Sequence, residues 1–125
     1  MKNKVVVVTG GAGGIGKAIA EAFKREGVKV CIIDITSNDY FVGDVGDKAT
    51  LEKFADKVIK EHGKVDYLIN NAPPTNKGMS DCSYEDFEAA MRVGVIASFY
   101  LAKLFDKHFA KGASIIINSR KHEST

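Results

Sequence analysis

The chain has 125 residues, a common size for one compact domain, and we expect residues 1–125 to form a single domain. Apolar residues make up 45% of the chain and charged residues 27%, which argues against a disordered or fibrous protein. The net charge of +2 is too small to indicate a nucleic-acid partner.

Cysteine use and hydropathy predict an internal, soluble protein. Cys31 and Cys82 lie far apart with no second Cys or His at metal-ligand spacing, so we expect neither a disulfide framework nor a metal site. After the basic start of the chain, only residues 5–8 form an apolar run before Thr9, whereas an export signal needs about 7–15 apolar residues. No apolar run approaches the roughly 20 residues that cross a bilayer. We therefore expect a cytoplasmic protein without a membrane partner.

The first thirty-odd residues predict a strand, a helix and a second strand. Residues 4–9 are a β-branched run typical of a buried strand. Five glycines within residues 10–16 follow, and then residues 17–25 place apolar side chains at helical spacing before Gly27. Residues 28–35 are apolar again except for Lys29 and Asp34, which completes a βαβ unit of about thirty residues.

The middle of the chain predicts a short third strand, a helix and a fourth strand. A brief strand is expected at residues 40–42, although a parallel crossover normally needs about a dozen residues. The connection within residues 36–43 has therefore lost its helix, so it is an irregular loop or the third strand is short and displaced. Asp47 is suited to cap a helix over Lys48–His62. Residues 65–69 are the fourth strand.

The last third predicts a long helix and a fifth strand. Ser83 begins the helix, which continues to residue 108 or 110, and residues 114–118 form the strand. The alternation predicts an α/β fold, a Rossmann-like doubly wound parallel sheet of about five strands in the order 3-2-1-4-5. Apolar side chains occur on several faces of the helix over residues 83–110, so we expect another subunit to cover it in a homo-oligomer.

The glycine cluster has the context of a phosphate-binding turn. Residues 8–16 read V-T-G-G-A-G-G-I-G between a predicted strand and a predicted helix. Glycines there permit a tight turn and a close approach of a pyrophosphate to the helix N-terminus. Asp34 follows Gly16 by eighteen residues, near the spacing of about 20 at which an acid accepts from the adenosine ribose hydroxyls. Because a carboxylate there repels a 2′-phosphate, NAD is favoured over NADP.

Three other interpretations compete with this one. A glycine cluster can be merely a flexible turn. Residues 11–17 match the start of a P-loop, but Ala18 follows and has no hydroxyl to hold Mg²⁺. A Rossmann-like methyltransferase that binds S-adenosylmethionine through the same turn is a less favoured alternative.

The chain resembles the short-chain dehydrogenase/reductase family over nearly its whole length. The family's T-G-x-x-x-G-x-G turn is matched by residues 9–16, its Asn-Asn-Ala motif by residues 70–72, and its Asp-Val pair by Asp44 and Val45. The resemblance implies an NAD(P)-dependent oxidoreductase that transfers hydride between a nicotinamide cofactor and a small-molecule alcohol or carbonyl substrate. The cofactor-binding residues that it implies are Thr9, Gly10, Gly14, Ile15, Gly16, Asp34, Asp44, Val45, Asn71 and Ala72.

The sequence departs from the family pattern at two places, and a third position is only a near match. Pro73 follows the Asn-Asn-Ala motif where the family has glycine, and Gly94 replaces a helix Asn of the family's proton relay. Ser119 is the nearest match to the catalytic serine that polarises the substrate carbonyl. Alternatively, Ser119 is only a strand-end residue that bonds its own backbone.

The family's Tyr-x-x-x-Lys motif does not occur in these 125 residues. The residues four positions after the four tyrosines are Asp44, Asn71, Glu88 and Leu104. We therefore interpret the chain as the cofactor-binding half of the family fold, truncated relative to the full enzyme, and expect no turnover by this chain alone. The alternative is a noncatalytic dinucleotide-binding or subunit-association module.

Overall fold

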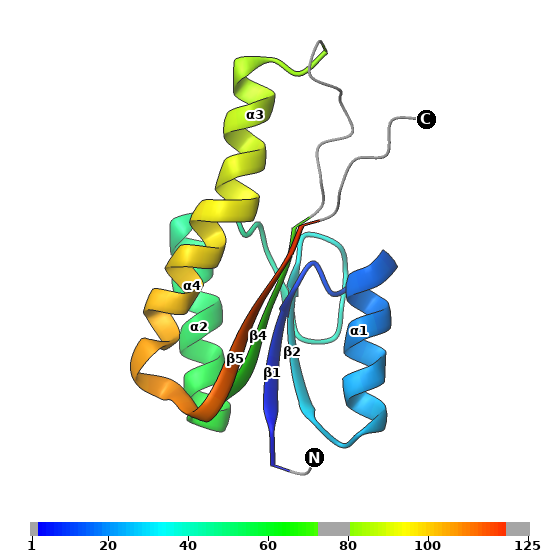
Figure 1. Cartoon of the computed structure of the whole chain (residues 1–125), viewed down its shortest axis with the longest axis vertical. Helices are drawn as coiled ribbons and strands as arrows, with labels where there is room; N and C mark the ends of the chain where they lie inside the picture. Colours follow the sequence, from blue (N-terminus) through cyan, green and yellow to red (C-terminus); the bar gives the residue numbers. More distant parts are fainter. Residues whose placement is uncertain (1–2, 73–80, 120–125) are drawn as a thin grey trace.

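A parallel sheet of five strands organises the computed structural model, which describes residues 3–72 and 81–119 (Figure 1). The strands are β1 (Val5–Thr9), β2 (Lys29–Asp34), β3 (Phe41–Val42), β4 (Val65–Ala72) and β5 (Phe109–Ser119). They lie in the order β3-β2-β1-β4-β5 and every pairing is parallel. The predicted strand order and Rossmann-like topology are confirmed, and the order reverses between β1 and β4.

Helices cover both faces of this sheet. Helix α1 (Gly14–Arg25) packs Ile19 and Phe23 on the face that carries Val6 and Val8 of β1. Helices α2 (Lys48–His62) and α4 (Ala97–Phe105) cover the opposite face, which carries Val7 (Figure 1). All five residues of β1 are buried, so its continuous apolar run reflects coverage from both sides.

Helix α2 has the bounds that its capping residues predict. The Asp47 side chain accepts a hydrogen bond from the backbone N–H of Thr50 at 3.0 Å, and Gly63 ends the helix with φ of 73°. Bonds from the Thr50 side chain and backbone stabilise the charged carboxylate, so the pKa of Asp47 lies below its usual value. These local signals explain why the helix was predictable from sequence.

The long helix predicted from residue 83 is divided into several helical segments, and the last of them ends at His108, the earlier of the two predicted ends. It consists of α3 (Tyr84–Met91), a π-helical turn η1 (Arg92–Ile96), α4, and a 3₁₀ turn η2 (Asp106–His108). The predicted start of the fifth strand at residue 114 is wrong, because β5 (Phe109–Ser119) begins five residues earlier. Between the pairs Val65–Phe109 and Tyr67–Ser114 the register shifts, and Gly112 has φ of 80°. This irregularity absorbs the additional residues of β5.

Smaller differences occur at other element ends. Helix α1 begins at Gly14, within the glycine cluster, and β4 continues through Asn70 and Asn71 although these residues are polar.

Cys31 is fully buried in β2, and burial raises the pKa of its thiol to about 11. In the described part of the chain, no helix is long and apolar enough to cross a membrane.

A buried carboxylate fixes the amino ends of β1 and β4. Asp66 is 3% exposed, and its Oδ2 accepts a hydrogen bond from the backbone N–H of Val5 at 2.8 Å. The ammonium groups of Lys64 and Lys4 lie 3.2 Å and 3.7 Å from its oxygens. The carboxylate therefore satisfies a strand-end donor while two partly exposed lysines balance its charge.

We predict that Asp66→Asn lowers the free energy of unfolding by about 2 kcal/mol, because it leaves both lysines without their counter-charge. Urea unfolding measures this as a lower midpoint at unchanged slope. The control is Asp56→Asn, which breaks only an exposed ion pair with Lys60 and should leave the midpoint nearly unchanged. Equal midpoints for Asp66→Asn and the native chain would contradict the assigned role of Asp66.

Candidate functional site

The glycine turn after β1 is closed by packing that excludes side chains. A Cβ on Gly16 would lie 2.0 Å from the carbonyl oxygen of Gly10 and 2.7 Å from Nδ2 of Asn71. Gly10 has φ of 68°, and a Cβ there would lie 2.5 Å from the carbonyl oxygen of Asn71. The Gly10 N–H donates to the carbonyl of Ile33 at 2.9 Å. These two positions require glycine for close packing and for backbone conformation.

Two other glycines leave the N-terminus of α1 open. A Cβ at Gly13 or Gly14 would meet nothing within 4 Å. Gly13 is the N-cap residue and supplies no capping side chain, so the first N–H groups of the helix receive no side-chain cap from it. Free N–H groups and the partial positive charge of the helix end suit a phosphate group.

Asp34 lies beside this turn at the end of β2. Its Oδ2 accepts a hydrogen bond from the backbone N–H of Ala12, and its Oδ1 accepts one from that of Thr36, each at 3.0 Å. A carboxylate has about four lone-pair sites. Each oxygen therefore keeps acceptor capacity that can be used by vicinal hydroxyl groups such as those of a ribose.

The loop after β3 contributes Asp44 and Val45. The Asp44 side chain is exposed, and its Oδ1 accepts a hydrogen bond from the backbone N–H of Gly46 at 2.8 Å. Its carbonyl accepts from the N–H of Asp47 at 3.1 Å, which closes a turn before α2. Val45 is partly buried against the core. The Asp44 carboxylate keeps one oxygen that accepts no bond in this turn.

Asn71 connects β4 to the glycine turn. Its backbone N–H donates to Oγ1 of Thr9 at 3.0 Å, and its Nδ2 donates to the carbonyl of Gly10 at 3.3 Å. The side chain thus braces the turn as well as lining the cavity beside it. The sequence motif predicted Asn71 as a cofactor-binding residue. It did not predict the contact with Gly10, because that contact depends on the pairing of β1 with β4.

A cavity of about 390 Å³ joins these elements at the carboxyl ends of the strands. Eight of the ten predicted cofactor-binding residues line it: Thr9, Gly10, Gly14, Ile15, Asp34, Asp44, Val45 and Asn71. Its other lining residues are Gly13, Ile33, Ile35, Thr36, Gly43 and Val93. Gly16 packs beneath the turn, and Ala72 lies at the end of β4. The size and position are those of a ligand site in a doubly wound sheet.

The predicted catalytic residue lies at the same end of the sheet. Ser119 is the last residue of β5 and pairs with Ala72. Gly94 falls inside η1, where its carbonyl accepts a hydrogen bond from Oγ of Ser98 at 2.6 Å. Pro73 lies outside the described residues.

Tyr100 is directed to another helix. Its hydroxyl donates to the carboxylate of Glu52 on α2, and this hydrogen bond raises the pKa of the phenol. The ring also packs against the core, as expected for a structural residue. Within residues 3–72 and 81–119, no three His, Cys, Asp or Glu side chains gather where they could hold a metal ion.

Comparison with known proteins places the chain in one family. The family model described as Enoyl-(Acyl carrier protein) reductase matches residues 10–123. The chain belongs to the short-chain dehydrogenase/reductase family. It is 33% identical to an uncharacterized oxidoreductase of Thermotoga maritima, with 94% of this chain and 53% of that protein covered. It is 26% identical to a D-threitol dehydrogenase of Mycolicibacterium smegmatis, with 100% of this chain and 55% of that protein covered.

A solved structure of the family also matches nearly all of this chain but only about half of its own. The chain superposes on a mutant short-chain dehydrogenase/reductase of Serratia marcescens with a TM-score of 0.81 at 27% identity. That match covers 91% of this chain and 55% of the other. The chain therefore spans about half the length of the curated relatives that it matches. Several of its relatives are named oxidoreductases or dehydrogenases, which supports an enzyme by family membership.

We predict that Gly13→Ala and Gly16→Ala separate binding from folding. Gly16→Ala should destabilise the fold by about 3 kcal/mol, since its Cβ meets backbone. Gly13→Ala places a methyl group in open space and should cost about 1 kcal/mol or less, while it weakens NADH binding at least about tenfold. Thermal unfolding and calorimetric titration measure the two effects. Full NADH affinity in Gly13→Ala would contradict a phosphate site at this turn.

Proposed function

We propose that residues 1–125 form a single NAD(H)-binding domain, the cofactor half of a short-chain oxidoreductase. The observation that carries this proposal is the cavity in which the glycine turn, the open N-terminus of α1 and Asp34 meet. The N–H groups of the helix would hold the pyrophosphate, and Asp34 would accept from the adenosine ribose hydroxyls. Asp44 would accept from the adenine amino group. Bound NAD(H) supplies the hydride donor or acceptor.

The electrostatics of Asp34 favour NAD(H) over NADP(H). Its carboxylate is fixed by two backbone N–H groups rather than by a cationic side chain. A 2′-phosphate would bring two further negative charges to the same edge of the cavity. Discrimination against NADP(H) then follows from repulsion together with the loss of a ribose hydroxyl donor.

The chemistry of the substrate side rests on fewer residues. Ser119 would donate a hydrogen bond to the carbonyl oxygen of a small alcohol or carbonyl substrate. One relative is named for the polyol threitol, which supports a hydroxylated substrate of small size. Because Tyr-x-x-x-Lys does not occur in these residues, we expect the chain alone to bind cofactor without turning over substrate. The free thiols Cys31 and Cys82 support a reducing compartment such as the cytoplasm.

We predict that calorimetric titration gives saturable NADH binding and at least about tenfold weaker NADPH binding. Asp34→Asn should lower the ratio of the NADPH to the NADH dissociation constant about tenfold, because it removes the repelling charge and an acceptor. The matched control is Asp39→Asn, which neutralises an exposed acid five residues later and should preserve the ratio. Equal affinities for NADH and NADPH in the native chain would overturn the NAD assignment.

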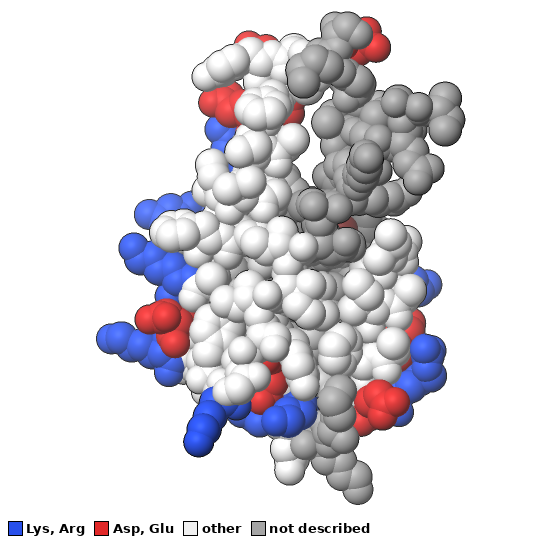
Figure 2. Space-filling model, in the orientation of Figure 1, with Lys and Arg blue, Asp and Glu red and all other residues white. Residues whose placement is uncertain are grey.

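We also propose that the outer face of α3, η1 and α4 contacts a second copy of the chain. Phe87, Met91, Val95 and Phe99 are exposed at four-residue intervals along it, and Phe99 is 65% exposed. Figure 2 shows acidic side chains at the end formed by α3, whereas basic side chains with acidic ones among them lie along the flank of α2 and α4. An antiparallel copy would place the acidic end of each helix beside the basic end of the other.

We predict that the native chain sediments as an oligomer without cofactor and that Phe99→Ser shifts it to the monomer. Phe99 is exposed in the single chain, so the variant should still fold, and its unfolding midpoint should lose the dependence on protein concentration that an oligomer shows. Val42→Ser removes an exposed apolar side chain elsewhere and is the control. A monomeric native chain at micromolar concentration would refute this contact.

A further inference from the structure

The connection from β2 to β3 is unusually short for parallel strands. Residues 35–40 join Asp34, the last residue of β2, to Phe41, the first of β3. A crossover of this kind normally takes a dozen or more residues and includes a helix. Here the connection contains no helix and adjoins the acid that faces the cavity. Hydrogen bonds within the loop must replace the missing helix.

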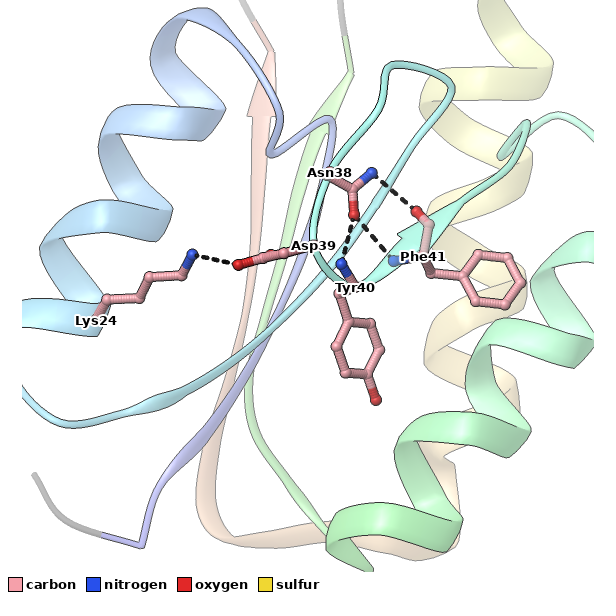
Figure 3. A network of polar contacts seen from close by, with 5 residues as sticks. All are labelled: Lys24, Asn38, Asp39, Tyr40 and Phe41. Atoms are coloured by element: carbon pink, nitrogen blue, oxygen red, sulfur yellow. Dashed lines mark hydrogen bonds and ion pairs between the residues drawn. The ribbon is translucent and has the colours of Figure 1, made fainter.

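One side chain supplies those hydrogen bonds. Nδ2 of Asn38 donates to the carbonyl oxygens of Thr36 and Phe41, at 2.9 Å and 3.0 Å. Its Oδ1 accepts from the backbone N–H groups of Tyr40 and Phe41, both at 2.9 Å, as Figure 3 shows for part of the network. An amide offers two donor hydrogens and two acceptor lone pairs. All four are used inside this loop, and we call the four bonds the Asn38 clasp.

The clasp connects to Asp34 through a single residue. Thr36 accepts from Asn38 with its carbonyl and donates its N–H to Oδ1 of Asp34 at 3.0 Å. The other carboxylate oxygen accepts from Ala12 in the glycine turn at 3.0 Å. The carboxylate is therefore held from two sides, by the turn on one and by the clasp on the other.

We propose that Asn38 is a positioning residue that sets the discrimination between NAD(H) and NADP(H). This inference rests on the proposed function of Asp34. Without the bond from Asn38 to Thr36, the Thr36 N–H can leave the carboxylate, which then remains bonded to Ala12 alone. A carboxylate free to rotate bonds the ribose hydroxyls less well and repels a 2′-phosphate less strongly. Asn38 acts through Thr36 and Asp34 and need not touch the cofactor.

The test compares Asn38→Ala with a control variant in α1 that breaks a different contact of the same loop. Lys24→Met breaks the exposed ion pair with Asp39, 3.3 Å long, and leaves the clasp intact (Figure 3). Calorimetry should show the ratio of NADPH to NADH dissociation constants falling about tenfold in Asn38→Ala and unchanged in Lys24→Met. Amide hydrogen exchange should be faster at Thr36 in Asn38→Ala and unchanged in β1.

The outcomes separate this proposal from the one on which it rests. An unchanged cofactor ratio in Asn38→Ala overturns the role in discrimination, even if Thr36 exchanges faster. Unchanged exchange at Thr36 overturns the positioning of Asp34 by Asn38. If the native chain bound neither cofactor, the proposed function would fall, while the exchange rates would still decide the positioning.

A second variant covers the case in which Asn38→Ala does not fold. Asn38→Asp keeps an oxygen that accepts from Tyr40 and Phe41 but lacks the Nδ2 donors. It should retain the turn and still show faster exchange at Thr36. Native-like exchange at Thr36 in Asn38→Asp would reject the proposal.

Discussion

The close contact between the glycine turn and the end of β4 is the constraint on which the site depends. Gly16 has no room for a Cβ, because the Gly10 carbonyl and the Asn71 amide occupy that space. The contact fixes where α1 begins relative to β1, and so where its free N–H groups point. Asn71 ties the same turn to β4, while Ala12 ties it to Asp34. One packed point thus positions the features that we assign to the pyrophosphate and to the ribose.

The parts of the fold that sequence predicted are those with local signals. The unbroken valines of β1 require burial on both faces, and the structure covers them on both. Asp47 and Gly63 delimit α2 by capping alone. Glycines at fixed spacing between a strand and a helix predicted the place of the cavity, since Gly10, Gly14 and Gly16 each support a conformation or contact that a side chain would block.

The parts that sequence missed depend on contacts between distant or irregular segments. The early start of β5 at Phe109 arises from a register shift against β4, and no periodic pattern of apolar residues encodes such a shift. The π-helical turn within the predicted long helix likewise leaves the apolar spacing almost unchanged. Asn38 carries no motif, and its importance emerges only when its four hydrogen bonds are seen together. Thr36 contributes to the site with its backbone N–H, and a backbone contact of this kind leaves no signal in the sequence.

We infer that this chain, which spans about half the length of its relatives, carries a complete site for NAD(H). Amide NMR shifts recorded while NAD⁺ is added test this claim most directly. We expect saturable shifts concentrated at residues 10–16, 34–36 and 43–45, which line or support the cavity. Shifts that fail to saturate, or that gather on another surface, would contradict it.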